Sequence, residues 1–111
     1  MLYLAIGLFA LAAVFGLLNL KHWAAAKRPP RPVVFTHGLF AATGLVLLLI
    51  YALRQPAPAL TTSLLFFVLA AMGGFYLFFR DVKGKIGPLG FVILHGLLAL
   101  TGFVILLWSV F

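Results

Sequence analysis

Two histidines, His37 and His95, are the residues of this 111-residue chain whose type and surroundings could support chemistry. Each lies inside a long apolar run, where a polar, titratable side chain is costly and commonly marks a functional site. An imidazole in such a place can bind a metal ion, carry a proton or donate a hydrogen bond across a helix interface. Any chemistry of the chain is therefore expected to centre on these two side chains.

The sequence around the first histidine recurs around the second. At a shift of 58 residues, the distance from His37 to His95, the segment HGLFAATG at 37–44 aligns with HGLLALTG at 95–102. Six of these eight positions are identical, and the same shift, without gaps, also places Gly16 on Gly74, Lys27 on Lys85 and Pro30 on Pro88. The pattern predicts a tandem duplication, with one histidine at the same place in each copy.

The composition places the chain in a membrane. Hydrophobic residues make up 66% of the sequence and charged residues 8%, which does not describe a water-soluble core with a polar shell. Four apolar stretches each reach the roughly 20 residues that a helix needs to cross a bilayer. We expect an all-α integral membrane four-helix bundle, a single transmembrane domain over residues 1–111. The expected spans are 1–20, 33–53, 60–79 and 88–110, and the two-helix repeats are 1–53 and 59–111.

Basic residues mark one end of the expected bundle. Seven of the eight lie in the connection between the first two spans or in that between the last two, namely Lys21, Lys27, Arg28, Arg31, Arg80, Lys83 and Lys85. The positive-inside rule then predicts that both connections face the cytoplasm and that both chain termini lie outside, in a multi-pass protein of the cytoplasmic (inner) membrane. Basic loops of this kind contact anionic lipid, so the expected partner is the bilayer and not a nucleic acid.

A haem is the cofactor that this histidine pair fits. We expect His37 and His95 to be the two axial ligands of the iron of one b-type haem, held between the second and fourth spans. Two imidazole ligands leave no open position on the iron, which suits electron transfer. The expected arrangement is similar to that of membrane b-type cytochromes, in which two histidines come from different helices of a four-helix bundle.

The residues around the histidines define the rest of the expected haem site. One and two turns after each histidine, the same helix face carries small residues that would border a flat cofactor, Ala41 and Gly44 in the first copy and Ala99 and Gly102 in the second. Basic side chains near the cytoplasmic surface would neutralise the haem propionates. The candidates are Arg31, Lys83 and Lys85.

A role without any cofactor is left open. Two histidines at matched depth can instead hydrogen-bond across helix interfaces, and a duplication would copy such a pair. The chain would then be an accessory or assembly subunit of a larger membrane complex, and the pairs Ala12/Gly16 and Ala70/Gly74 would permit close helix contact. Homodimerisation is equally open. Zinc is disfavoured, because it prefers four ligands and the chain has no cysteine.

A small transporter or channel is the remaining alternative, although the membrane-embedded glutamate of the small multidrug transporters has no counterpart here. The single acidic residue, Asp81, is expected in a loop. Enzymatic turnover is not expected, because there is no carboxylate pair and no nucleophile beside a base. Thr61, Thr62 and Ser63 are interpreted as the N-terminal cap of the third span.

Overall fold

The protein consists of four long α-helices, as the apolar stretches predict. The computed structural model describes residues 1–111, with α1 at Leu2–Ala24, α2 at Arg31–Arg54, α3 at Pro58–Val82 and α4 at Leu89–Val110. Each helix extends beyond the corresponding apolar stretch at one or both ends except α4, which begins one residue later than expected. Every helix is long and apolar enough to cross a membrane, which is consistent with a multi-pass membrane protein.

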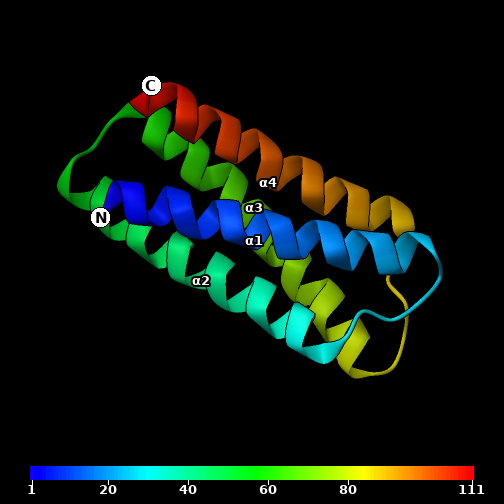
Figure 1. Ribbon diagram of the computed structural model, residues 1–111. Helices are drawn as coiled ribbons and strands as arrows, with labels where there is room; N and C mark the ends of the chain where they lie inside the picture. The colour runs from blue at the N-terminus through cyan, green and yellow to red at the C-terminus, as the bar shows by residue number, and fades with distance from the viewer.

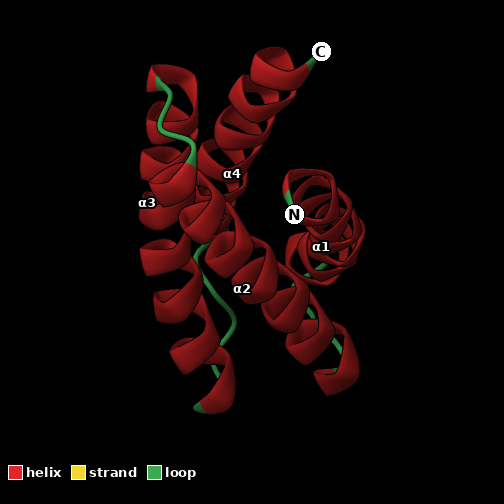
Figure 2. Ribbon diagram, turned by 90° about the vertical axis from the view of Figure 1, so that its left-hand side faces the viewer, coloured by secondary structure: helices red, strands yellow, loops and turns green.

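The helices run up and down with short connections (Figure 1). One end of the bundle carries the α1–α2 and α3–α4 loops and is called the basic end here. The opposite end carries both chain termini and the α2–α3 loop and is called the terminal end. Figure 2 shows that helices make up almost the whole chain, with only short loops between them. The antiparallel pairs α1/α2 and α3/α4 have the most extensive contacts, while α2/α3 and α1/α4 touch less.

Both loops at the basic end begin with the same turn. After α1, Ala26 has a φ of 55°, and the Lys27 amide donates to the carbonyl of His22. After α3, Gly84 has a φ of 77°, and the Lys85 amide donates to the carbonyl of Arg80. This left-handed residue with a six-to-one hydrogen bond is the Schellman motif, which commonly ends a helix.

Prolines mark the starts of the last three helices. Pro30 and Pro88 precede α2 and α4, and Pro58 is the first residue of α3. Proline suits these places because its fixed φ is already helical and the first helical amides have no partner in the helix. No side chain caps α3, so the interpretation of Thr61, Thr62 and Ser63 as its cap is wrong.

A packed apolar cluster fills the core at the terminal end. It comprises Ala5, Phe9, Leu48, Leu60, Phe67 and Leu106. The rings of Phe9 and Phe67 stack with their centroids 4.0 Å apart and so connect the diagonally opposed helices α1 and α3. Outside this core, large apolar side chains face outward all round the bundle, and only 17 of 111 residues are buried. Such a surface is consistent with helices that cross a membrane.

Candidate functional site

His37 and His95 occupy equivalent places on α2 and α4. Each is the seventh residue of its helix, which puts each about 9 Å from the helix start at the basic end. Both side chains are partly buried, and their ring centroids lie 6.2 Å apart with the ring planes at 80°. The bundle therefore brings the two predicted site residues into direct contact across its centre.

The same hydrogen bond orients each ring. His37 Nδ1 lies 2.7 Å from the carbonyl oxygen of Ala12 on α1, and His95 Nδ1 lies 2.7 Å from that of Ala70 on α3. A carbonyl oxygen only accepts, so Nδ1 carries the hydrogen in both rings, and a neutral ring then has its lone pair on Nε2. Neither Nε2 has a hydrogen-bond partner in the protein, so both remain available to a ligand.

A glycine makes room for each ring. A Cβ atom on Gly16 would lie 3.0 Å from His37 Cε1, and a Cβ atom on Gly74 would lie 3.0 Å from His95 Cε1. A side chain at either position would therefore force the ring to shift. Ala12 with Gly16, and Ala70 with Gly74, thus form two histidine seats, each made of one carbonyl acceptor and one missing side chain.

The seats could be anticipated only in part. The sequence singles out both pairs as small residues that permit close helix contact, and their 58-residue spacing matches that of the histidines. The spacing alone cannot show that the object brought close is an imidazole and not a helix. The only sign in the sequence that the two small-residue pairs belong to the histidine site is that the pairs and the histidines are both 58 residues apart.

The pair has the spacing of two imidazoles that share a metal ion. If each were to bind through Nε2 from opposite sides of the metal, the ring centres would be about 6 Å apart, because a metal–nitrogen bond is about 2 Å and the nitrogen lies about 1 Å from its ring centre. A hydrogen bond from Nδ1 to a carbonyl is also the usual way in which proteins orient a ligating histidine. No group of three or more His, Cys, Asp or Glu side chains gathers anywhere in the chain, so the site offers two protein ligands.

The small residues beyond the histidines lie in different surroundings. Ala41 and Ala99, one turn after each histidine, are partly buried. Gly44 packs against the ring of Phe9, and Gly102 packs against Phe66 and Phe67, with a Cβ position 3.2 Å from the nearest atom in both cases. A flat group would reach Gly44 only if the Phe9 ring moved, and Gly102 only if the α3 backbone at Ser63 moved as well. The assignment of both glycines to a cofactor stays a prediction.

The three propionate candidates lie at the basic end and are exposed. Arg31 begins α2, and Lys83 and Lys85 lie in the α3–α4 loop. None of them has a side-chain hydrogen bond or an ion pair. All three are therefore free to approach an anionic group at this end of the bundle, whether it belongs to a cofactor or to lipid.

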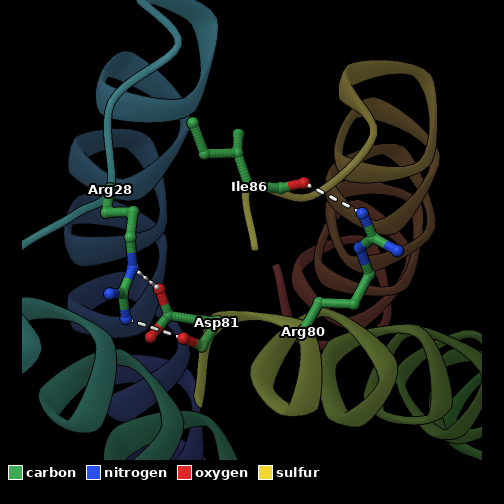
Figure 3. A network of polar contacts seen from close by, with 4 residues as sticks. All are labelled: Arg28, Arg80, Asp81 and Ile86. Atoms are coloured by element: carbon green, nitrogen blue, oxygen red, sulfur yellow. Dashed lines mark hydrogen bonds and ion pairs between the residues drawn. The ribbon is translucent and has the colours of Figure 1, made fainter. Parts of the chain in front are cut away.

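Asp81 departs from its expected position. It lies in the last turn of α3 and is 3% exposed, so its assignment to a loop is wrong. Arg28, from the α1–α2 loop, donates through Nη2 to the Asp81 carbonyl at 2.7 Å and places Nε 3.6 Å from Oδ1 (Figure 3). The same figure shows Arg80 reaching the carbonyl of Ile86. The only acid is thus buried because a cation from the other half of the chain lies against it.

Comparison of the chain with protein-family models, with curated proteins and with solved structures finds no match. A function has to be argued from the site itself.

Proposed function

We propose that this chain is a membrane electron-transfer protein in which His37 and His95 together ligate the iron of one b-type haem. The observation that carries the proposal is the pair of seated imidazoles, 6.2 Å apart, each fixed through Nδ1 and each with an unpartnered Nε2. Iron with two imidazole ligands has no open position, so the group would exchange electrons without binding oxygen.

The residues fit such a group by their donor type and by their surroundings. Haem needs only one or two protein ligands, whereas a zinc site needs about four. At the level of the histidines, α1 and α3 contribute alanine and glycine to the core, and the space left by Gly16 and Gly74 admits the two imidazole rings. Arg31, Lys83 and Lys85 would neutralise propionates directed toward the basic end.

The proposal includes a tandem duplication and an orientation. The matched sequence segments are accompanied by matched hydrogen bonds, glycine seats and Schellman turns in the two halves, all at a spacing of 58 residues. One ancestral two-helix unit accounts for all of these at once. The seven basic residues at one end favour a cytoplasmic location for that end, in the inner membrane.

A cofactor-free accessory subunit is the second candidate, because one observation favours it. The two imidazoles already contact each other edge to face, and their hydrogen bonds to α1 and α3 tie all four helices together. Interhelical hydrogen bonds in membranes contribute about 0.6 to 2 kcal/mol each. A packing pair would need only Nδ1, whereas a haem would need Nε2.

Replacing a histidine by asparagine distinguishes the haem role from the packing role. Its amide nitrogen takes the place of Nδ1 and can still donate to the Ala12 or Ala70 carbonyl, but nothing replaces Nε2. The test is the optical spectrum of the detergent-purified protein, oxidised and then reduced with dithionite, from cells supplied with a haem precursor. The proposal predicts a Soret band and sharp reduced α and β bands, lost in His37→Asn and in His95→Asn. The control His22→Asn changes a histidine that bonds only within α1 and should keep the spectrum.

A colourless wild-type protein would contradict the haem proposal. If His37→Asn is then as stable as the wild type and His37→Ala is less stable, the pair is a packing device and the accessory role stands.

A further inference from the structure

The four helices form two hairpins, each with its own polar contacts. The first hairpin is α1 with α2 and the second is α3 with α4, and the helices of one hairpin touch far more extensively than helices of different hairpins. His37 bonds to α1 and His95 bonds to α3, so each histidine is seated entirely in its own hairpin. Ser63 likewise bonds to α4, within the second hairpin.

One side-chain hydrogen bond joins the two hairpins. Arg28 of the first hairpin donates through Nη2 to the Asp81 carbonyl of the second at 2.7 Å, and its Nε lies 3.6 Å from Asp81 Oδ1 (Figure 3). Every other side-chain hydrogen bond stays within one helix or one hairpin. Arg80 gives the contrast at the same end, because its partner, Ile86, belongs to the same hairpin.

The apolar contacts between the hairpins are concentrated at the terminal end. The packed apolar cluster there takes residues from all four helices, and the Phe9–Phe67 stack crosses from one hairpin to the other. At the basic end the buried apolar side chains are Leu77 and Val92, and both belong to the second hairpin. The two hairpins are therefore joined by an apolar core at one end and by an ion pair at the other.

Closure of the basic end has a cost that closure of the terminal end lacks. Asn19 and Asp81 lie on the core-facing stripes of α1 and α3, are 4% and 3% exposed, and each has an oxygen without a hydrogen-bond partner. Such atoms are costly to bury, and separation of the hairpins would return them to water at the membrane surface. Arg28 is 40% exposed, so water also competes for the ion pair.

The covalent connection between the hairpins lies at the end where the apolar core is. It consists of the three residues 55–57 between α2 and α3, at the terminal end. Short segments at the ends of helices are the places where hinge motions absorb changes in backbone dihedral angles. The hairpins can thus swing apart at the basic end while the terminal end stays packed.

We infer that Arg28 and Asp81 form a latch between two hairpins that hinge at the terminal end, so that release of the latch opens the basic end. The histidines face each other across the line of opening, because one belongs to each hairpin. Opening therefore separates the two imidazoles and leaves each ring in its own seat. If the haem proposal holds, this motion admits the flat group between them; the latch itself does not rest on that proposal.

Distances between spin labels in the haem-free protein test the hinge, because the native chain has no cysteine and only introduced thiols are labelled. Lys21→Cys with Phe79→Cys reports on the basic end, and Leu4→Cys with Thr62→Cys reports on the terminal end. All four positions are exposed, and both pairs join α1 to α3. Pulsed electron paramagnetic resonance in lipid nanodiscs gives the distance distribution of each pair.

Arg28→Gln removes the latch, and Arg80→Gln is the matched control, since Arg80 bonds within the second hairpin. Loss of the partner of a buried carboxylate is strongly destabilising, so Arg28→Gln should raise the ratio of long to short basic-end distances about tenfold or more. The terminal-end distances should stay as in the protein with native Arg28. Arg80→Gln should leave both distributions unchanged.

Unchanged basic-end distances in Arg28→Gln would overturn the latch, and an equal change in Arg80→Gln would show that any lost cation has the same effect. Equal lengthening at both ends would overturn the hinge. Asp81→Asn keeps the fold testable if Arg28→Gln does not fold, because it removes the ion pair and leaves the carbonyl that Arg28 contacts. Its long-distance fraction should exceed that of the protein with native Asp81, and an equal fraction would contradict the role of the carboxylate.

Discussion

At the scale of single residues, the site depends on two glycines without side chains as much as on the two histidines. Each histidine needs a carbonyl that can accept a second hydrogen bond and a glycine that leaves space for the ring. A carbonyl has two lone pairs, so Ala12 and Ala70 can serve their own helices and the histidines together. The glycines are therefore as much a part of the site as the imidazoles.

Replacing Gly16 by alanine should displace His37. The new Cβ would lie 3.0 Å from His37 Cε1, and overpacking of this kind costs about 1 to 3 kcal/mol. Gly16→Ala and Gly74→Ala should lower the thermal midpoint in detergent and reduce haem content together. Gly7→Ala is the matched control on α1, because no atom lies within 4 Å of its Cβ position. If Gly16→Ala were as stable and as haem-loaded as Gly7→Ala, the seat would have no role.

The histidines could be predicted from the sequence, because their cost in hydrocarbon and their repetition both mark them. The burial of Asp81 could not be predicted. It depends on Arg28, 53 positions away, which only the folded chain brings to it. The role of Ser63 could not be predicted either, because a serine near the start of a helix reads as a cap, while its hydroxyl in fact crosses to α4.

At the scale of elements, the two turns at the basic end differ in one residue that matters. The first has alanine at the left-handed position and the second has glycine. A left-handed conformation costs a non-glycine residue about 1 to 2 kcal/mol.

Ala26→Gly should therefore raise the free energy of unfolding by about 1 kcal/mol, and Gly84→Ala should lower it by a similar amount. Equilibrium unfolding in mixed micelles, followed by circular dichroism, measures both. Ala25→Gly is the control for the first turn, because Ala25 has a φ of −89° and gains nothing from glycine. If Ala26→Gly and Gly84→Ala changed the free energy of unfolding in the same direction, the two turns would not be equivalent.

The bond from Ser63 to Gly102 should connect α3 and α4 measurably. Ser63→Ala removes a fully buried hydroxyl, and the lost bond should cost about 1 kcal/mol in the same unfolding assay. Alanine fits the space sterically, since Ala5 occupies the aligned, equally buried position of α1. Thr43→Ala is the control, because the Thr43 hydroxyl bonds within its own helix and is exposed. An equal cost for both substitutions would mean that the interhelical bond adds nothing.

At the scale of the whole molecule, the four helices and their apolar surfaces were predictable because a helix that can cross a bilayer needs about 20 apolar residues, and the sequence has four such stretches. His37 and His95 do lie across the bundle from each other, with ring centroids 6.2 Å apart, while their role as haem ligands stays a prediction. The exact helix ends were less predictable, because the turns at the basic end carry charged residues that helices tolerate outside hydrocarbon. The packing of Phe9 against Gly44 and of Phe67 against Gly102 could not be predicted. It depends on how all four helices are rotated relative to one another, which the periodicity of the sequence does not give.

The orientation of the bundle is open to a direct test. Alkaline phosphatase fused after Phe111 should be active in a bacterial host, and the same enzyme fused after Lys85 should be at least about tenfold less active, because that loop is expected in the cytoplasm. A fluorescent protein that folds only in the cytoplasm should give the opposite pattern. High phosphatase activity at Lys85 with low activity at Phe111 would invert the topology and place the basic end outside.

The central claim is that His37 and His95 share one iron, and a haem titration of the purified protein tests it most directly. Absorbance at the Soret band should saturate at one haem per chain, with a low-spin spectrum typical of two imidazole ligands. His37→Asn and His95→Asn should each lose the low-spin spectrum while remaining folded. The claim would be contradicted if the Soret absorbance did not saturate. It would also be contradicted if the absorbance saturated at the same haem content after both histidines were replaced by asparagine.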